Sequence, residues 1–240
     1  MNDAIERLKK AIQNSDNIVF FGGAGVSTES GIPDFRSADG LYNMKYDYPP
    51  ETILSHSFFM QNTGAFYRFY RDKMLYPDAK PNKAHYALAK LERQGKLKAI
   101  ITQNVDSLHH AAGSVNVLEL HGSCNRNYCT KCGAKYTLEV ILASDDIPIC
   151  SCGGTIKPDV VLFEESLDQR VIEKSVSAIR KADVLIVGGT SLNVYPAAGL
   201  IQYYNGNQLI LINKSETSFD RYANIIIHDS IGETLSSAVD

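Results

Sequence analysis

Residues 17–27, NIVFFGGAGVS, run from a short apolar stretch straight into a glycine-rich turn. A strand, such a turn and then a helix would present backbone N–H groups to a pyrophosphate. Gly23 and Gly25 flank Ala24, but Thr28 stands where the third glycine of the dinucleotide fingerprint is expected. The acidic residue expected about twenty positions further on is also absent. These two departures from the fingerprint disfavour a Rossmann enzyme of the hydride-transfer type. At this point, a glycine turn that binds no ligand remains the alternative interpretation.

Five further apolar runs have the character of buried strands. They are rich in Val, Ile and Leu and do not alternate with polar residues, which favours strands covered on both faces of a parallel sheet. Helical patterns lie between several of them, at residues 82–94, with Asn82 as the N-cap, and at residues 168–181. This alternation predicts an α/β fold, a Rossmann-like doubly wound parallel sheet of about six strands. With residues 17–21, the predicted strands are residues 98–102, 117–120, 184–188, 208–213 and 224–228.

Composition narrows the classes of protein that remain. The 240 residues are 44% hydrophobic and 21% charged, with a net charge of −3, which fits one large domain with or without a small insert. No basic stripe indicates a nucleic-acid partner, and no stretch is long enough to span a membrane. Residues 1–15 have the pattern of an amphipathic helix, not of a signal peptide. We therefore expect a cytoplasmic monomer.

Two close cysteine pairs lie in the middle of the chain, separated by seventeen residues: Cys129, Cys132, Cys150 and Cys152. Two thiolates on a tight turn, repeated once, make a closed tetrahedral site for one structural zinc ion. Gly133 and Gly153 follow the pairs and would let backbone N–H groups approach the thiolates. Disulfides or free thiols are the alternatives, and a cytoplasmic setting argues against disulfides. We expect a small zinc-binding lobe at residues 124–155, inserted in a domain formed by residues 1–123 and 156–240.

Residues 31–57 break the alternation of strands and helices. They are rich in Gly, Pro, Asp and Tyr and too long for a simple connection, so we expect a functional loop. Within it Asp34, Phe35 and Arg36 supply a carboxylate, an aromatic face and a fixed cation in succession. Such a set can hold a charged, ring-bearing ligand over the glycine turn. A salt bridge beside a core phenylalanine remains the alternative.

Polar side chains follow the ends of four predicted strands, where ligands bind in open α/β sheets. Asp106 alone could be explained as a helix cap, but a cap does not use all of residues 103–106. His121 follows the next strand and could act as a general base, although a lone histidine is more often structural. The full set is Gln103, Asn104 and Asp106, then His121, then Gly189, Thr190 and Ser191, and finally Asn213.

Taken in order, these motifs resemble the sirtuin family of NAD-dependent protein deacylases, and the short chain looks like a bacterial member. The likeness covers nearly the whole chain, and it is the ordered series that makes it specific. The matching segments are residues 23–27 and 30–36, 102–106 with 108–109 and 112–113, 120–122, the four cysteines, 189–192 with 196–198, and 212–213.

The resemblance implies a protein lysine deacetylase that transfers the acyl group to ADP-ribose and releases nicotinamide. His121 would deprotonate a ribose hydroxyl, with Asn104 as the second catalytic residue. The acyl-lysine peptide would pair as an extra strand between two segments, Val161, Leu162, Phe163, Glu164 and Leu192, Asn193, Val194, Tyr195. NAD would contact Gly23, Ala24, Gly25, Thr28, Asp34, Phe35, Arg36, Gln103, Asn104, Val105, Asp106, His121, Gly189, Thr190, Ser191, Asn213 and Ile231.

The chain departs from the family at a few positions. Gly22 stands where the family usually has threonine, and Glu164 where it has glycine. Members that remove acidic acyl groups carry a Tyr and an Arg three residues apart, whereas this chain has Tyr67 and Tyr70, so a deacetylase is favoured. Mono-ADP-ribosyl transfer to a protein and a non-catalytic NAD- and zinc-binding adaptor remain as alternative functions.

Overall fold

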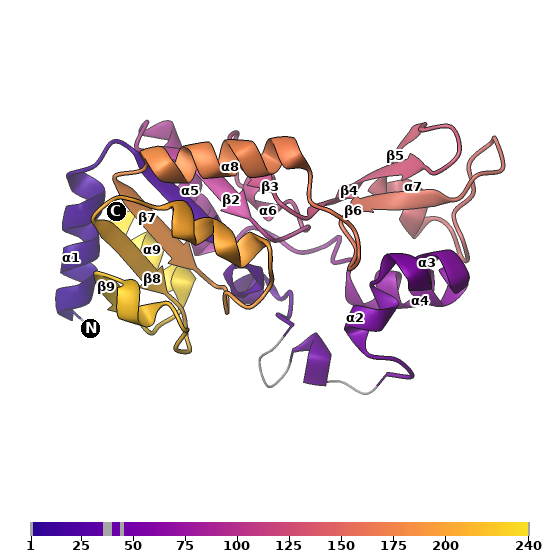
Figure 1. Cartoon of the computed structure of the whole chain (residues 1–240), viewed down its shortest axis with the longest axis horizontal. Helices are drawn as coiled ribbons and strands as arrows, with labels where there is room; N and C mark the ends of the chain where they lie inside the picture. Colours follow the sequence, from indigo (N-terminus) through magenta and orange to yellow (C-terminus); the bar gives the residue numbers. More distant parts are fainter. Residues whose placement is uncertain (1, 36–39, 44–45, 240) are drawn as a thin grey trace.

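The computed structural model describes residues 2–35, 40–43 and 46–239, and it has two lobes that lie side by side along the long axis of the molecule (Figure 1). The larger lobe is built on a six-stranded sheet of order β3-β2-β1-β7-β8-β9, in which every neighbouring pair is parallel. This order confirms the predicted doubly wound fold. The strands are β1 Ile18–Gly22, β2 Leu97–Thr102, β3 Val117–Glu119, β7 Val184–Gly188, β8 Gln208–Ile212 and β9 Ile225–Ile227.

Helices cover both faces of this sheet, because successive side chains of each strand point to opposite faces. Phe20 of β1 packs in the apolar cluster formed with α1, α5 and α9, whereas Phe21 packs in the cluster formed with α8 and η4. Both phenylalanines are fully buried. The helical segments of this lobe are α1 Asn2–Gln13, α5 Lys83–Arg93, α6 Leu108–Ala111, α8 Gln169–Lys181, α9 Ile231–Val239, and the 3-10 turns η1 Ala24–Val26, η2 Thr28–Ser30, η4 Ala197–Tyr203 and η5 Asp220–Tyr222.

Helix α5 begins at Asn82, as the sequence predicts. The Asn82 side-chain oxygen accepts a hydrogen bond from Ala84 N at 2.9 Å, and His85 Nδ1 accepts one from Asn82 N at 3.2 Å. The Asn82 amide nitrogen also donates to Val26 O at 2.8 Å and to Ser30 Oγ at 3.0 Å. One cap therefore starts the helix and attaches it to the turn that follows β1.

The smaller lobe contains a three-stranded antiparallel sheet of order β5-β4-β6. Its core is an aromatic cluster that joins this sheet to helices α2–α4, with the rings of Phe66 and Tyr70 stacked 5.4 Å apart. The small sheet extends past residues 124–155 at both ends. Its elements are α2 Pro50–Ile53, α3 His56–Gln61, α4 Thr63–Lys73, β4 Gly122–Cys129, β5 Lys135–Thr137, α7 Leu138–Leu142 and β6 Ile156–Val160, and η3 Leu41–Asn43 precedes them.

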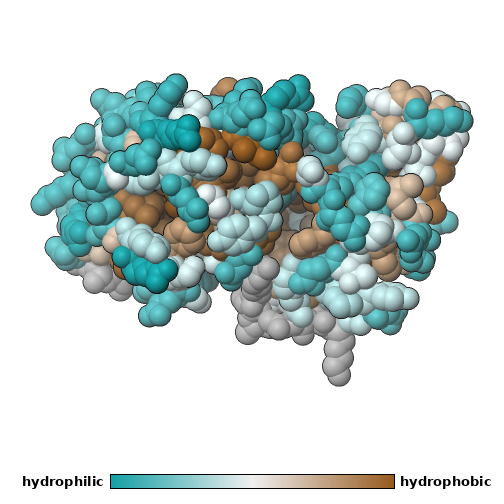
Figure 2. Space-filling view, in the orientation of Figure 1, coloured by the Kyte–Doolittle hydropathy of each residue, from teal (hydrophilic) through white to brown (hydrophobic). Residues whose placement is uncertain are grey.

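Apolar residues are visible in the furrow between the two lobes, with polar residues around it (Figure 2). Among the described residues, no helix has the length and apolar character that crossing a membrane requires.

Candidate active site and metal centre

A cavity of about 1500 Å³ lies between the lobes, beyond the carboxyl ends of β1, β2, β7 and β8. Its floor includes the turn after β1, which touches the turn after β7. Gly25 N donates to Gly189 O at 2.8 Å, and a Cβ on Gly25 would lie only 2.8 Å from Gly189 Cα. This close approach requires glycine at position 25, and it brings the two turns to the point where the order of the sheet reverses.

Most of the residues predicted for the site line this one cavity. Arg36 lies outside the described residues. Leu192 is 2% exposed and packs in the core beneath the sheet, apart from the cavity wall. The predicted residues that line the cavity are Gly23, Ala24, Gly25, Thr28, Asp34, Phe35, Gln103, Asn104, Val105, Asp106, His121, Val161, Leu162, Phe163, Glu164, Gly189, Thr190, Ser191, Asn193, Val194, Tyr195, Asn213 and Ile231.

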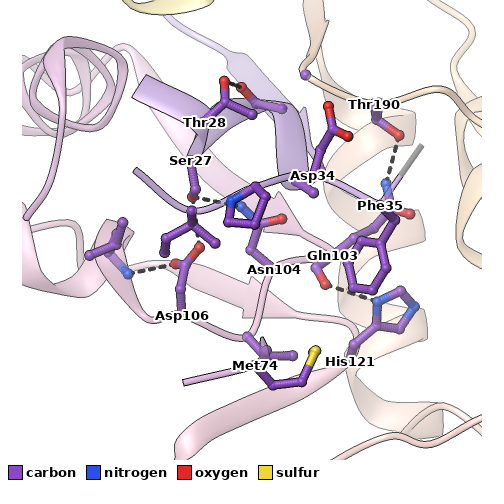
Figure 3. A pocket seen from close by; sticks show the side chains of 18 of the residues that line it. Ser27, Thr28, Asp34, Phe35, Met74, Gln103, Asn104, Asp106, His121 and Thr190 are labelled. Atoms are coloured by element: carbon purple, nitrogen blue, oxygen red, sulfur yellow. Dashed lines mark hydrogen bonds between the residues drawn. The ribbon is translucent and has the colours of Figure 1, made fainter. Parts of the chain in front are cut away.

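Ser27 connects two of the polar residues that follow β2, Asn104 and Asp106 (Figure 3). Its hydroxyl accepts from Asn104 Nδ2 at 3.0 Å and donates to Asp106 Oδ2 at 2.7 Å. The other carboxylate oxygen of Asp106 accepts from Leu108 N, in the first residue of α6, at 2.9 Å, although the N-cap position of this helix is Ser107 and not Asp106. Because Ser27 is 1% exposed and Asn104 8% exposed, these bonds fix both side chains firmly against the turn after β1.

A second chain of hydrogen bonds fixes the turn after β7. Gln103 Nε2 donates to Thr190 Oγ1 at 3.0 Å, and the same hydroxyl accepts from Leu192 N at 3.2 Å. The Asn213 side chain accepts from Thr190 N at 2.9 Å and donates to Thr190 O at 2.7 Å. Since both polar atoms of the Asn213 amide already bind Thr190, the main effect of this amide is to hold the Thr190 backbone.

His121 follows β3 and its ring lies beside Phe35 in the cavity (Figure 3). Its Nδ1 is 2.9 Å from Gln103 O. A carbonyl oxygen only accepts, so Nδ1 carries the hydrogen and Nε2 keeps a free lone pair in the neutral ring. Burial lowers the pKa of His121, and the hydrogen bond to Gln103 opposes this effect. The imidazole is therefore neutral at pH 7 and able to accept a proton.

Three non-glycine residues of the described chain have positive φ: Ser107 at 61°, Glu164 at 74° and Leu192 at 57°. Ser107 and Glu164 line the cavity, and Leu192 stands between the lining residues Ser191 and Asn193. A side chain in the left-handed region costs roughly 1–3 kcal/mol, and such strain concentrates at functional sites. This backbone geometry therefore points to the same cavity as the polar networks do.

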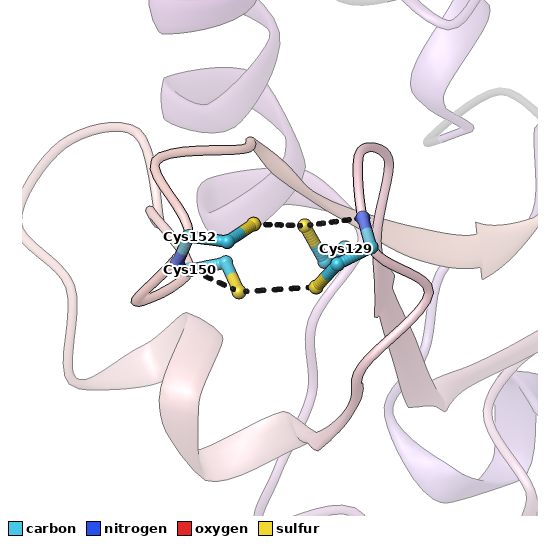
Figure 4. A group of neighbouring side chains, drawn as sticks. Cys129, Cys150 and Cys152 are labelled. Carbon is cyan, nitrogen blue, oxygen red and sulfur yellow. Dashed lines mark hydrogen bonds between the residues drawn. The ribbon is translucent and has the colours of Figure 1, made fainter.

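The sulfur atoms of the four predicted metal ligands face one another in the small lobe (Figure 4). They all lie within 4.8 Å of one another, with 3.4 Å between the sulfurs of Cys129 and Cys152 and 3.6 Å between those of Cys132 and Cys150. A tetrahedral zinc–thiolate site has sulfurs about 3.8 Å apart, whereas a disulfide needs about 2.0 Å. The four thiols therefore suit one zinc ion and are not disulfide-bonded.

Backbone N–H groups approach the sulfurs, but they are not those of the glycines that follow each pair. Lys131 N lies 3.4 Å from Cys129 Sγ, and Cys152 N lies 3.5 Å from Cys150 Sγ. Gly133 N instead donates to the Cys129 carbonyl at 3.0 Å, and this glycine has a φ of 73°. The glycine closes the turn and leaves the N–H groups within the turn directed at sulfur, where they offset thiolate charge.

A model of the Sir2 family matches residues 23–196. This span contains the turn after β1, the turn after β7, His121 and the four cysteines. The chain belongs to the Sir2 family. The expected resemblance to sirtuins is thereby confirmed.

Bacterial relatives of this Sir2 chain match it over almost its full length. A protein of Clostridium acetobutylicum named NAD-dependent protein deacetylase is 61% identical over 241 residues, covering 99% of this chain and 98% of the relative. A protein of Clostridium perfringens with the same name is 59% identical, and the match covers 100% of both chains.

Solved Sir2 structures share the fold. One, described as a basis for the mechanism and regulation of Sir2 enzymes, has a TM-score of 0.91 and 41% identity, covering 100% of this chain and 97% of the other. A Sir2 complex with a p53 peptide and NAD+ has a TM-score of 0.86 and 40% identity, covering 96% and 95% of the two chains. At this identity, the likeness extends beyond the course of the backbone.

Several residues that the sequence analysis did not select also line the cavity of this sirtuin. Ser27 belongs to the quoted glycine turn but was given no role, although it is the centre of a buried network. A serine one residue before Thr28 carries no distinguishing pattern. Met74, Leu138 and Leu142 line the small-lobe side, and no periodicity in the sequence relates these three positions to the glycine turn.

Proposed function

We propose that this Sir2 protein is an NAD-dependent protein lysine deacetylase. The observation that carries the proposal is the placement of His121, a neutral imidazole with Nε2 free, at the wall of a cavity floored by a glycine-rich nucleotide turn. The names of the bacterial relatives support the same activity, as does the complex of a solved Sir2 protein with peptide and NAD+.

The dinucleotide would lie along the floor of the cavity. Ala24 would offer its backbone N–H to the phosphates, since the N–H groups of Gly23 and Gly25 already donate to Gly188 O and Gly189 O. Thr28 also lines this part of the cavity. Thr190 and Ser191, in the turn held by Gln103 and Asn213, would contact the adenosine half. Ile231, at the start of α9, would pack near the adenine.

The nicotinamide end would lie over Phe35 and the residues that follow β2. Asn104 and Asp106 are held by Ser27 in fixed orientations, so they meet the nicotinamide ribose and its amide without reorganisation. When bound, NAD supplies the ribose carbon that receives the acyl oxygen and loses nicotinamide. His121 Nε2 would then take a proton from a ribose hydroxyl, which allows that hydroxyl to attack the acyl carbon.

The protein substrate would add as a strand between residues 161–164 and 192–195, which line the same cavity apart from buried Leu192. Tyr67 and Tyr70, the positions considered for acyl preference, are both fully buried in the small-lobe core, and neither is among the cavity-lining residues. Neither tyrosine carries a positive charge that could pair with an acidic acyl group. This supports acetyl as the preferred group.

The test is the exchange His121→Ala. General-base assistance is worth about two to four powers of ten in rate, so we expect peptide deacetylation to fall by about that factor, with fold and zinc content unchanged. The first expulsion of nicotinamide should persist, because it precedes the step in which His121 accepts a proton. His110→Ala is the matched control, because His110 is an exposed histidine outside the cavity. Nicotinamide release and product masses from an acetyl-lysine peptide would be measured.

Normal turnover by the His121 variant would contradict the mechanism. A target protein that gains the mass of ADP-ribose, in place of a deacetylated peptide, would indicate transfer of ADP-ribose to protein instead.

A further inference from the structure

Glu164 combines a positive backbone φ with two side-chain hydrogen bonds to a single partner, Ser57. It has a φ of 74°, a region that L side chains rarely adopt. Its Oε2 accepts from Ser57 N at 2.9 Å and its Oε1 accepts from Ser57 Oγ at 2.9 Å. Both carboxylate oxygens therefore bind one residue in the first turn of α3, about a hundred positions away in the chain.

Backbone bonds join the same two segments. Phe163 N donates to Leu54 O and His56 N donates to Phe163 O, each at 3.0 Å, so that residue 163 pairs with residue 55 in a parallel bridge. On the other side, Val161 N donates to His121 O at 3.0 Å. The segment of residues 161–164 thus lies between residues 54–56 on one side and His121, the proposed base, on the other.

Residues 161–164 form one wall of the cleft proposed for the peptide. The N–H groups of Val161, Leu162 and Phe163 already donate within the protein, so the backbone of Glu164 itself is among the groups left to pair with a peptide. Such groups must be held in one fixed conformation, since any ordering on binding reduces affinity. The left-handed conformation at Glu164 belongs to a turn in which Glu165 N donates to Leu162 O at 3.0 Å, and the two bonds to Ser57 hold that turn in place.

We propose that Glu164 is a positioning residue for the acyl-lysine peptide, acting through its two hydrogen bonds to Ser57. The inference rests on the proposed function, because it names a determinant of substrate binding for that reaction. The peptide KM depends on Glu164, whereas kcat and the KM for NAD depend on other residues.

The test compares three exchanges at one position and one at its partner. Glu164→Asn keeps a residue that tolerates positive φ but shortens the side chain, so it does not reach Ser57. We expect its peptide KM to rise about five- to tenfold, with kcat within about twofold. Glu164→Gln recovers most of this loss, because its amide oxygen accepts from Ser57 N and its amide nitrogen donates to Ser57 Oγ.

We expect Glu164→Gly to raise the peptide KM as Glu164→Asn does. Because glycine relieves the backbone strain, such a rise would show that loss of the hydrogen bonds sets the KM. Ser57→Ala raises KM less, because the Ser57 N–H bond to Glu164 remains. The double variant Glu164→Asn with Ser57→Ala binds no worse than Glu164→Asn alone, since the shared bonds are already lost. Amide hydrogen exchange at Ser57 accelerates in Glu164→Asn, a readout that needs no turnover.

An unchanged peptide KM in Glu164→Asn overturns the proposal. A KM in Glu164→Gln as high as in Glu164→Asn also overturns it, because charge and not hydrogen-bond geometry would then be responsible. Equilibrium binding of an acetyl-lysine peptide, followed by fluorescence anisotropy, separates this proposal from the proposed function. A wild-type chain that binds the peptide but releases no nicotinamide refutes the function, while the ratio of dissociation constants still decides the role of Glu164.

Discussion

The two sheets of this sirtuin are stabilised in different ways. The large sheet has apolar clusters on both faces, and all residues of β1 and β7 are buried. The small sheet has short strands such as β5, three residues long and at least partly exposed throughout, and it depends on an aromatic cluster and four cysteines. A lobe with a deep core keeps its fold by burial alone, whereas a lobe with a thin sheet requires a cross-link.

Removal of zinc gives the sharpest test of this difference and the largest expected effect. Structural zinc contributes on the order of 10 kcal/mol in small zinc domains, so we expect chelation or Cys132→Ser to unfold the small lobe while the large sheet persists. Metal content, limited proteolysis within residues 122–160 and far-UV circular dichroism would be measured. Cys124→Ala is the control, because Cys124 is a buried thiol outside the cluster.

Continued protection of residues 122–160 in the metal-free chain would show that the aromatic cluster alone supports the small lobe. The two lobes would then differ in the size of their apolar cores and not in the kind of interaction that stabilises them.

Acid should weaken the large lobe through two buried histidines. His85 and His109 are at most 1% exposed, with ring centroids 4.7 Å apart. Burial lowers the pKa of His85 to about 4, and burial together with the neighbouring His85 lowers the pKa of His109 to about 3. As pH falls from about 6.5 to about 4, only the unfolded chain takes up these protons, so stability decreases by on the order of 1 kcal/mol per pH unit for each ring.

Urea unfolding at pH 7 and pH 5 measures this loss. His109→Leu removes one titrating ring and should make the free energy of unfolding less dependent on pH. Identical pH dependence in the His109 variant and the wild type would exclude the buried pair as the acid-sensitive element.

The smallest expected effect concerns the helix cap at Asn82. Asn82→Ala should lower stability by about 1 kcal/mol and raise the KM for NAD, because the cap also binds Val26 O and Ser30 Oγ behind the glycine turn. Asp168→Ala is the matched control, since Asp168 caps α8 and does not line the cavity. Thermal unfolding and NAD titration would be measured, and equal KM values for the two variants would contradict a link between α5 and the nucleotide turn.

The same contrast explains what the sequence allowed us to predict. The strands of the large sheet lie within a residue or two of the predicted runs, because a strand buried on both faces needs a continuous apolar run. The cavity could be predicted because parallel strands bring their carboxyl ends to one edge, which placed Gln103, His121 and Thr190 together.

The small lobe was less predictable. The sequence indicated the metal ligands by spacing, but nothing in it showed that helices α2–α4 pack on the cysteine-bearing sheet. Contacts such as Tyr67 with the Ile156 carbonyl join residues far apart in the chain and follow no local periodicity. The role of Ser27 was missed for a related reason, since its partners Asn104 and Asp106 come from another strand end.

Gly122 has a φ of 75°, and a Cβ there would lie 1.9 Å from Asp159 O, so the chain crosses from the large sheet to the small one at a point that admits no side chain. His121 stands immediately before this crossing, with its ring bound to Gln103 at the end of β2. If the small lobe moved relative to the large lobe, the His121 imidazole would thus keep its position relative to the large sheet. Such motion would change how far the acyl-lysine reaches, while the separation between ring and ribose would stay constant.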